Sequence, residues 1–265
     1  MKSGLIGRTG FVGGCLLRQR HFDLAFSSRD IGALASHRYS LLVCAGAPAQ
    51  KWLANRDPDG DLRSLASLFA ALERVECERL VLISTVDVFA EPLGIDEESR
   101  PQAAGLHAYG RHRLMLEEAV RARFGDALIV RLPGLVGPGL RKNAVHDLHH
   151  SHELRAVDSR AVFQFYPMIR LWPDVHAALE AGLRVLHLTA EPVSVAEVAR
   201  IGFGREFENH AVSTPPRYDM QTRHASLFGG RGQYQYSARE SLLAIRAYAL
   251  SEPLRSGSLA AGAAR

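Results

Sequence analysis

The stretch that decides the fold is "GLIGRTGFVGG", residues 4–14. Gly7, Gly10 and Gly13 recur at every third position, directly after an apolar run and at the start of a helical pattern. Glycine allows a tight turn from strand to helix and lets the backbone approach a phosphate, whose charge the helix N-terminus stabilises. The alternative is a glycine turn that only packs a helix close to a strand. The rest of the chain has to distinguish the two.

Short apolar runs alternate with amphipathic stretches over the first two-thirds of the chain. The runs lack clean polar alternation and predict strands at Lys2–Gly7, Leu24–Ser28, Ser40–Ala45, Arg79–Ser84 and Ala127–Leu132. Between them, "DLRSLASLFAALERVE" and "YGRHRLMLEEAVRARF" have the apolar spacing of helices. Buried strands separated by helices form a parallel sheet that is covered on both faces. We therefore predict a doubly wound α/β fold of the Rossmann type, with a dinucleotide on the glycine turn.

The rhythm of strand and helix changes near residue 140. We expect a dinucleotide-binding domain over residues 1–145 and a smaller, substrate-capping portion over 146–250. Within this portion "LRVLHLT" predicts a returning strand, and Ser194 followed by Glu197 predicts a capped helix. Residues 251–265 are rich in Ser, Gly and Ala, which is typical of a flexible tail.

Composition narrows the function classes. The net charge is +4 and the basic residues are scattered, which argues against a nucleic-acid-binding face. No apolar run approaches the ~20 residues needed to span a bilayer, so we expect no membrane association. The three cysteines are widely spaced and suggest neither disulfides nor a zinc knuckle, which fits a cytoplasmic protein.

Four histidines gather in "VHDLHHSHELR": His146, His149, His150 and His152. Four imidazoles could hold zinc, but no cysteine or patterned carboxylate completes a familiar ligand spacing. We expect a polar loop that faces the substrate, and no metal.

The end of the second predicted strand bears on the choice of cofactor. Ser27, Ser28 and Arg29 stand where an acidic residue would grip the ribose 2′-hydroxyl of NAD, and Arg8 lies inside the glycine turn. Guanidinium and hydroxyl groups suit a 2′-phosphate, so NADP is favoured. Asp30 keeps NAD as an alternative if the strand ends later. The arginines could also be surface residues, since 29 of the 32 basic residues are arginine.

Small and hydroxyl side chains end the third and fourth strands, at the edge where open α/β sheets bind ligands. The third strand ends in Ala45, Gly46 and Ala47, and the fourth ends in Ser84 and Thr85. The segments "GRTGFVG", "VCAGA", "LISTVDVF", "AYGRHRLMLEE" and "VRLPGLVGPG" follow one another between residues 4 and 140. In this order they resemble the extended short-chain dehydrogenase/reductase family, the NAD(P)-dependent epimerase/dehydratase group that acts mainly on nucleotide sugars.

The resemblance implies a catalytic set of Thr85, Tyr109 and Arg113. Tyr109 is the acid/base residue, and Thr85 holds the reacting hydroxyl or carbonyl. The family has a lysine where this chain has Arg113. Because arginine carries the same charge, we expect Arg113 to substitute by lowering the pKa of Tyr109, which must fall by about 3 units for Tyr109 to act as a base at neutral pH.

The remaining site residues follow from position and from the same resemblance. For the cofactor we expect residues of the glycine turn, the strand ends and the catalytic helix: Gly7, Arg8, Thr9, Gly10, Phe11, Val12, Gly13, Ser28, Arg29, Ala45, Gly46, Ala47, Ser84, Tyr109, Arg113 and Pro133. For the substrate we expect Thr85, Asp87, Arg141 and Lys142, although the last two could equally be solvated. Val86 breaks the acidic pair that dehydratases of the family carry, so a reductase or epimerase is favoured.

These observations predict an NADP-dependent oxidoreductase or epimerase that acts on a sugar or nucleotide sugar. The region after residue 140 is short for the family, which implies a small or open pocket. The resemblance also implies a homodimer. The alternative is a weakly catalytic NADP-binding redox sensor or partner-binding protein, because an altered lysine position beside an intact glycine turn is what such a protein would show.

Overall fold

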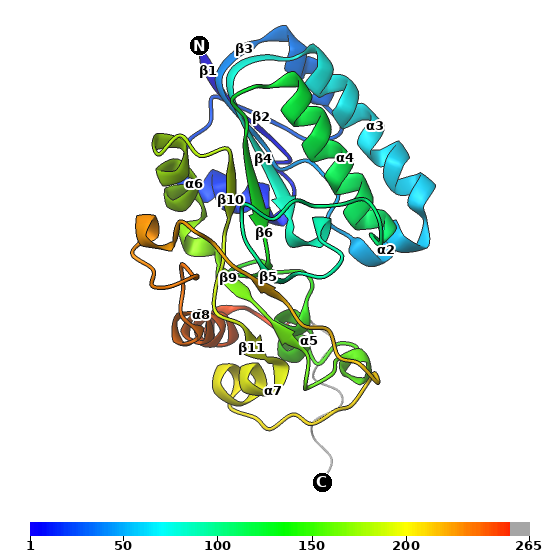
Figure 1. The fold of residues 1–265 in the computed structure, drawn as a ribbon, viewed down its shortest axis with the longest axis vertical. Coiled ribbons are helices and arrows are strands. Elements are labelled where there is room, and N and C mark those ends of the chain that lie inside the picture. Colours follow the sequence, from blue (N-terminus) through cyan, green and yellow to red (C-terminus); the bar gives the residue numbers. More distant parts are fainter. Residues whose placement is uncertain (255–265) are drawn as a thin grey trace. The chain divides into compact units, whose positions relative to one another are not determined.

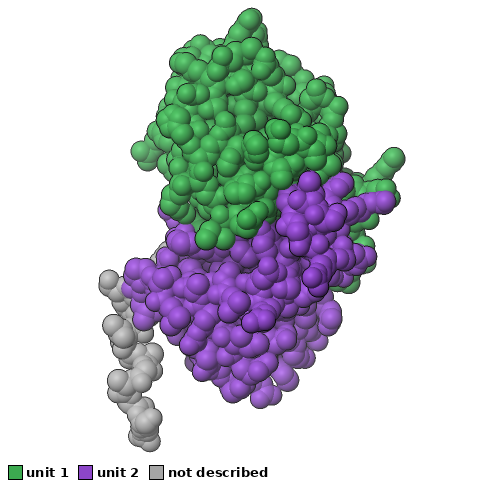
Figure 2. Space-filling model, turned by 90° about the vertical axis from the view of Figure 1, so that its left-hand side faces the viewer, with its two compact units in different colours: residues 1–132, 169–188 green, residues 133–168, 189–265 purple. Residues whose placement is uncertain are grey.

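A computed structural model of the protein describes residues 1–254, and the chain packs into two compact units (Figure 2). Unit 1 contains Met1–Leu132 and Ile169–Leu188. Unit 2 contains Pro133–Met168 and the chain from Thr189 onward. The first continuous segment of unit 1 thus ends at Leu132, before the expected residue 145. Residues 169–188 also belong to unit 1, because they contain the last strand of its sheet. Residues 255–265 of the expected tail lie outside the described residues.

Unit 1 is built on a six-stranded sheet with the order β10-β6-β4-β3-β1-β2, in which every pairing is parallel (Figure 1). Its strands are β1 Lys2–Ile6, β2 Leu24–Phe26, β3 Arg38–Cys44, β4 Glu76–Thr85, β6 Leu128–Leu132 and β10 Val185–His187. Each strand predicted from an apolar run is present. The predicted α/β fold with a doubly wound parallel sheet is confirmed.

Helices cover both faces of this sheet (Figure 1). On one face α1 (Phe11–Gln19) packs beside α6 (Leu171–Glu180). On the other, α2 (Lys51–Arg56), α3 (Pro58–Arg74) and α4 (Ala108–Arg123) pack together. Unit 1 also contains the short strand β5 (Leu93–Ile95) and 3₁₀ turns at Ile31–Ser36 and Val86–Val88.

Side-chain caps fix where the two long helices begin. Asp57 accepts the Gly60 N–H at 2.9 Å, and Pro58 occupies the first position of α3, where its missing N–H costs nothing. His107 caps α4, because its Nδ1 accepts the Gly110 N–H at 3.0 Å. These caps set the register in which α3 and α4 present residues to each other.

The core of unit 1 lies between the sheet and the α3–α4 layer. Leucines of the central strands β3 and β4 are fully buried there, and so are residues on one side of both helices: Leu42, Leu80, Leu82, Leu65, Leu116 and Val120. Strands buried on both faces explain why the sequence shows continuous apolar runs.

Unit 2 consists of short elements. Its strand pairs are parallel β7 (Gly134–Val136) with β9 (Phe165–Pro167), and antiparallel β8 (Val162–Phe163) with β11 (Val193–Ser194). Its other elements are α5 (Ala144–His150), α7 (Val195–Glu197) with a π-helical turn over Val198–Gly202, β12 (Asp219–Met220), α8 (Ala238–Ser251), and 3₁₀ turns at Leu154–Ala156 and Ala225–Phe228. The predicted capping box of Ser194 and Glu197 is present. Within residues 1–254, no helix has the length and apolar character to cross a membrane.

Candidate active site

The glycine turn between β1 and α1 is too tight for side chains. Gly7 has a φ of +96°, and a Cβ there would lie 2.3 Å from the Ala45 carbonyl oxygen. A Cβ on Gly13 would lie 2.1 Å from the Gly7 oxygen. Gly10 forms the N-cap of α1 without a side-chain capping hydrogen bond. The first turn of α1 therefore offers backbone N–H groups to an anion, which fits a dinucleotide pyrophosphate.

The end of β2 contains an ion pair that the sequence did not predict. Arg8 contacts Asp30 at 2.6 Å and the Ala25 carbonyl, both through Nη1. Asp30 also accepts the Ser27 N–H at 2.6 Å and the Ser27 hydroxyl at 2.9 Å. The Ser27 hydrogen bonds, followed by Arg8, lower the pKa of Asp30 to about 2. Arg29 is exposed. The sequence predicted only arginines and serines around a 2′-phosphate here, and the structure adds the carboxylate of Asp30 beside Arg8.

Thr85 and Tyr109 come together where β4 ends and α4 begins. The Tyr109 side chain is buried, and burial raises the pKa of its hydroxyl, while the neighbouring Thr85 acts in the opposite direction. Gly110 allows the approach, because a Cβ there would lie 2.1 Å from the Asp87 carbonyl oxygen. Asn55 of α2 accepts the Tyr109 backbone N–H at 2.9 Å. Thr85 and Tyr109, two of the three residues that the resemblance assigned to catalysis, are therefore neighbours.

The net pKa of Tyr109 lies above its ordinary value. Burial is the largest cause, and Arg113 acts against it by lowering the pKa. Asp87 raises the pKa again through its negative charge. Arg113 therefore acts in the predicted direction, but burial outweighs it. The phenol is protonated at neutral pH and is ready to donate a proton.

Arg113 is held by α3. Its guanidinium forms two 3.0 Å hydrogen bonds with the Asp61 carboxylate and a further one with the Pro48 carbonyl. It lies over the face of the Tyr109 ring, 4.4 Å from the ring centroid. His112 shares Asp61 at 2.8 Å. Both Arg113 and Asp61 are buried, so a carboxylate compensates most of the charge that was predicted to act on Tyr109.

A second cation, Lys51, lies beside the site. Its Nζ atom contacts Asp87 Oδ1 at 2.7 Å. His107 approaches the same oxygen through Nε2 at 3.9 Å. Burial, followed by the charge of Lys51, lowers the pKa of His107, whereas Asp87 raises it. Asp87 was predicted as a substrate contact, and it is already paired.

Ser84 faces away from this cluster. Its hydroxyl donates to Glu117 at 2.6 Å inside the layer between the sheet and α4. Glu117 also accepts two hydrogen bonds from the buried Arg131 at 2.7 and 3.0 Å, and one from Arg121 at 3.1 Å. The Ser84 hydroxyl, which was predicted to contact the cofactor, therefore donates its hydrogen bond to a buried carboxylate.

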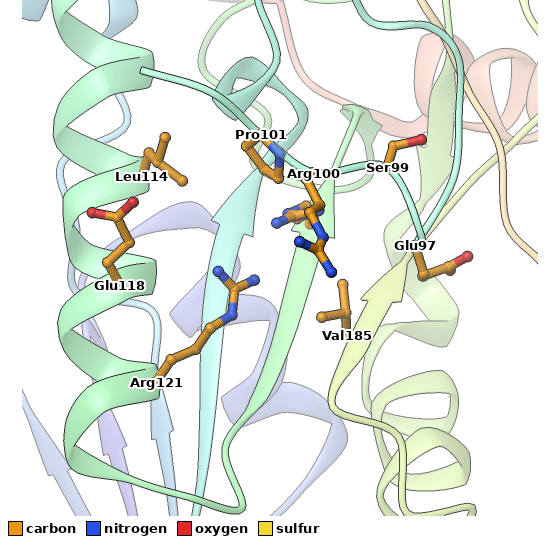
Figure 3. Close-up of a pocket in the computed structure, with 9 residues that line it drawn as sticks. Glu97, Ser99, Arg100, Pro101, Leu114, Glu118, Arg121 and Val185 are labelled. Atoms are coloured by element: carbon orange, nitrogen blue, oxygen red, sulfur yellow. The ribbon is translucent and has the colours of Figure 1, made fainter. Parts of the chain in front are cut away.

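A pocket lies between α4 and β10 (Figure 3), and Arg131, which binds Glu117, forms part of its lining. Figure 3 shows the guanidinium groups of Arg100 and Arg121 turned towards the same space. The lining residues are of mixed charge: Glu97, Ser99, Arg100, Pro101, Leu114, Glu118, Arg121, Arg131 and Val185. None of the predicted site residues lines this pocket.

Three predicted site residues belong to unit 2. Pro133 is its first residue, and Arg141 and Lys142 are exposed there. Their roles remain predictions.

The histidine-rich stretch forms α5 rather than a loop. His146 and His150 are buried, with ring centroids 4.5 Å apart. Among the residues that the structure describes, no group of three or more His, Cys, Asp or Glu side chains has an arrangement that could hold a metal ion.

Comparison with known proteins identifies the class. Residues 20–162, more than half of the chain, match the model of the NAD dependent epimerase/dehydratase family. The chain belongs to this family, as the resemblance of its motifs predicted. The prediction of a nicotinamide dinucleotide cofactor is confirmed at the level of NAD(P).

Solved structures of similar fold cover nearly the whole chain. RMD from Pseudomonas aeruginosa complexed with NADPH is 18% identical, with a TM-score of 0.72 and coverage of 94% of this chain and 99% of that one. UDP-glucuronic acid 4-epimerase from Bacillus cereus, in complex with UDP-glucuronic acid and NAD, is 17% identical, with a TM-score of 0.71 and coverage of 94% and 99%. For dTDP-4-dehydrorhamnose reductase from Yersinia enterocolitica the values are 15%, 0.70, 94% and 99%. No curated protein matches the sequence.

Proposed function

We propose that the protein is an NAD(P)-dependent oxidoreductase or epimerase that acts on a nucleotide sugar. The observation that carries this proposal is the close approach of the start of α4, with Tyr109, to the end of β4, with Thr85, at the carboxyl edge of the sheet that bears the glycine turn. Structures of similar fold include an epimerase bound to UDP-glucuronic acid and a reductase named for a dTDP-sugar, which supports the substrate class. The sensor alternative rests on the altered lysine position alone, and the family does not favour it.

The dinucleotide, when bound, supplies or accepts a hydride at the substrate carbon. Tyr109 donates its phenolic proton to the carbonyl oxygen in the reductive direction and takes a hydroxyl proton in the oxidative direction. Thr85 donates a hydrogen bond to the same oxygen and so fixes its distance from Tyr109. The backbone N–H groups at the start of α1 hold the pyrophosphate.

NADP is the favoured cofactor, with NAD as the alternative. Arg8 and Arg29 give two positive charges near the end of β2, and Asp30 gives one negative charge. Arg8 uses only Nη1 for Asp30 and Ala25, and Arg29 is exposed, so both can reach towards a 2′-phosphate.

We also propose a cytoplasmic homodimer. All three cysteines are free thiols, which suits a reducing compartment. The exposed Met115 on α4 and Trp52 on α2 give that side of unit 1 apolar groups that a second copy could cover.

The test is turnover by the purified protein. NADPH oxidation should be followed with 4-keto nucleotide sugars, and epimerisation with UDP-sugars, each beside Tyr109→Phe. Turnover with one substrate class, reduced about 10²- to 10⁴-fold in Tyr109→Phe, supports the proposal. Cofactor binding without turnover across both panels contradicts it.

A further inference from the structure

Lys51 is one of only three lysines in the chain, and it opens α2 beside the proposed active site. Its Nζ atom lies 2.7 Å from Asp87 Oδ1, and the two side chains are only 37% and 15% exposed. Asp87 in turn lies against Thr85, whose hydroxyl is 3.4 Å from Asp87 Oδ2 and accepts the Asp87 N–H at 3.2 Å. Lys51 is therefore one residue removed from the hydroxyl that would hold the substrate oxygen.

The charge on Asp87 works against catalysis unless it is balanced. A carboxylate beside Tyr109 makes the phenolate less stable, and it competes for the Thr85 proton. Arg113 cannot balance it, because Asp61 already binds its guanidinium at two positions. The groups around Tyr109 come from four elements and their flanks: Lys51, Asp61, Thr85, Asp87, His107, His112 and Arg113. Among these, Lys51 is the cation paired with Asp87.

We propose that Lys51 is a positioning residue of the reaction: its ammonium group fixes and neutralises Asp87, so that the Thr85 hydroxyl stays available to Tyr109 and to the substrate oxygen. The proposal rests on the function proposed above for this site. In this proposal Lys51 on α2 supplies the positive charge that assists the reaction. Arg113, which stands at the family's lysine position, instead binds Asp61 and joins α4 to α3.

Without Lys51, Asp87 loses the cation that contacts it at 2.7 Å, so it becomes a stronger acceptor for Thr85 and its negative charge beside Tyr109 is less well balanced. The Lys51→Met variant should therefore lose about 10-fold in kcat, and the pH at which the oxidative rate rises should move up by about one unit, with KM little changed. Lys51→Arg should restore most of the rate. Lys2→Met, the same change at an exposed position of β1, should behave like the wild type.

The decisive variant combines Lys51→Met with Asp87→Asn. If Lys51 acts through Asp87, removing the carboxylate makes the lysine unnecessary, and the double variant should be faster than Lys51→Met alone. A double variant as slow as the single one, or a defect confined to KM, would show that Lys51 contacts the substrate directly and would overturn the proposal. Unfolding midpoints of the single and the double variant that equal the wild-type midpoint exclude a folding defect as the cause of a lower rate.

A titration of His107 tests the charge balance without turnover. Lys51 lowers the pKa of this imidazole and Asp87 raises it. Followed by NMR, with His107→Gln to assign the signal, the His107 pKa should rise in Lys51→Met and fall in Asp87→Asn. If the wild type turns over no substrate but His107 responds, the proposed function fails and the electrostatic link stands. If His107 responds to neither variant, the inference fails even in an active enzyme.

Discussion

At the scale of single residues, the question is how a tyrosine works when arginine replaces lysine four positions later. Arg113 supplies a positive charge 4.4 Å from the Tyr109 ring, but it does so while bound to Asp61. Its effect on the phenol is therefore smaller than that of an unpaired cation at the same distance. Burial of the phenol outweighs this effect, so the pKa of Tyr109 lies above its ordinary value.

The raised pKa predicts opposite pH dependences for the two directions of reaction. A phenol that keeps its proton through the neutral range remains a donor, so the rate of reduction should be constant there and fall only in the alkaline range. The oxidative rate needs the phenolate and should rise with pH. Initial rates in both directions, with Tyr109→Phe as the control, check this. A reduction rate that falls between about pH 6 and 8 would contradict the assignment of Tyr109 as the donor.

Cofactor preference is a second prediction at this scale. Arg29→Ala should weaken NADP binding by about 5- to 150-fold, or roughly 1–3 kcal/mol, because a charge-assisted contact with the 2′-phosphate is lost. NAD lacks this phosphate, so its affinity should hardly change and serves as the internal control. Calorimetry with both nucleotides measures the difference. Equal losses for NADP and NAD would show that Arg29 does not contact the 2′-phosphate.

At the scale of elements, the site depends on how closely α4 begins to the end of β4. Gly110→Ala would place a Cβ 2.1 Å from the Asp87 carbonyl oxygen, so the start of α4 must move and carry Tyr109 away from Thr85. We expect turnover to fall at least 10-fold, as misplaced catalytic groups commonly cause, while cofactor binding at the α1 turn persists. Gly125→Ala, where a Cβ would meet nothing within 4 Å, is the matched control. Full activity in Gly110→Ala would show that this contact does not set the site.

The elements were largely predictable and the contacts between them were not. The glycine turn, the strand ends and the helix of Tyr109 follow from local patterns. A strand buried on both faces is a short apolar run, and a helix has a regular apolar spacing, so both can be recognised in a short stretch of sequence. Asp61 was missed because the first turn of α3 contains two acidic residues, Asp59 and Asp61, and only its packing on α4 decides which of them is buried. Lys51 was missed for the same reason, since the position of α2 beside Asp87 depends on a contact 36 residues apart in the chain.

At the scale of the whole chain, the unexpected feature is that unit 1 is discontinuous. The run "LRVLHLT" was correctly predicted as a returning strand, but it pairs in parallel with β6 and so belongs to the unit 1 sheet. Sequence patterns gave the strand and could not give its partner, because a parallel pairing can join segments at any separation along the chain.

A cofactor that binds the folded turn should stabilise this unit. At a concentration about 100 times its Kd, NADP should add roughly 2.7 kcal/mol to the free energy of unfolding, because the unfolded chain has no site for it. Unfolding in urea with and without NADP measures the shift. Gly13→Ala should abolish it, since a Cβ there would lie 2.1 Å from the Gly7 oxygen. A shift of the same size in Gly13→Ala would mean that the cofactor binds elsewhere.

The Asp61–Arg113 pair also limits how this chain can change over generations. A lysine at position 113 presents a single ammonium group in place of a fork, and it cannot bond both oxygens of Asp61 and the Pro48 carbonyl in the same way. A neutral residue at position 61 leaves the buried guanidinium without its carboxylate partner, which is costly. Each single step towards a lysine at position 113 therefore passes through a less stable protein. The two positions are coupled, and a lineage that has acquired this pair is held to it unless both residues change together.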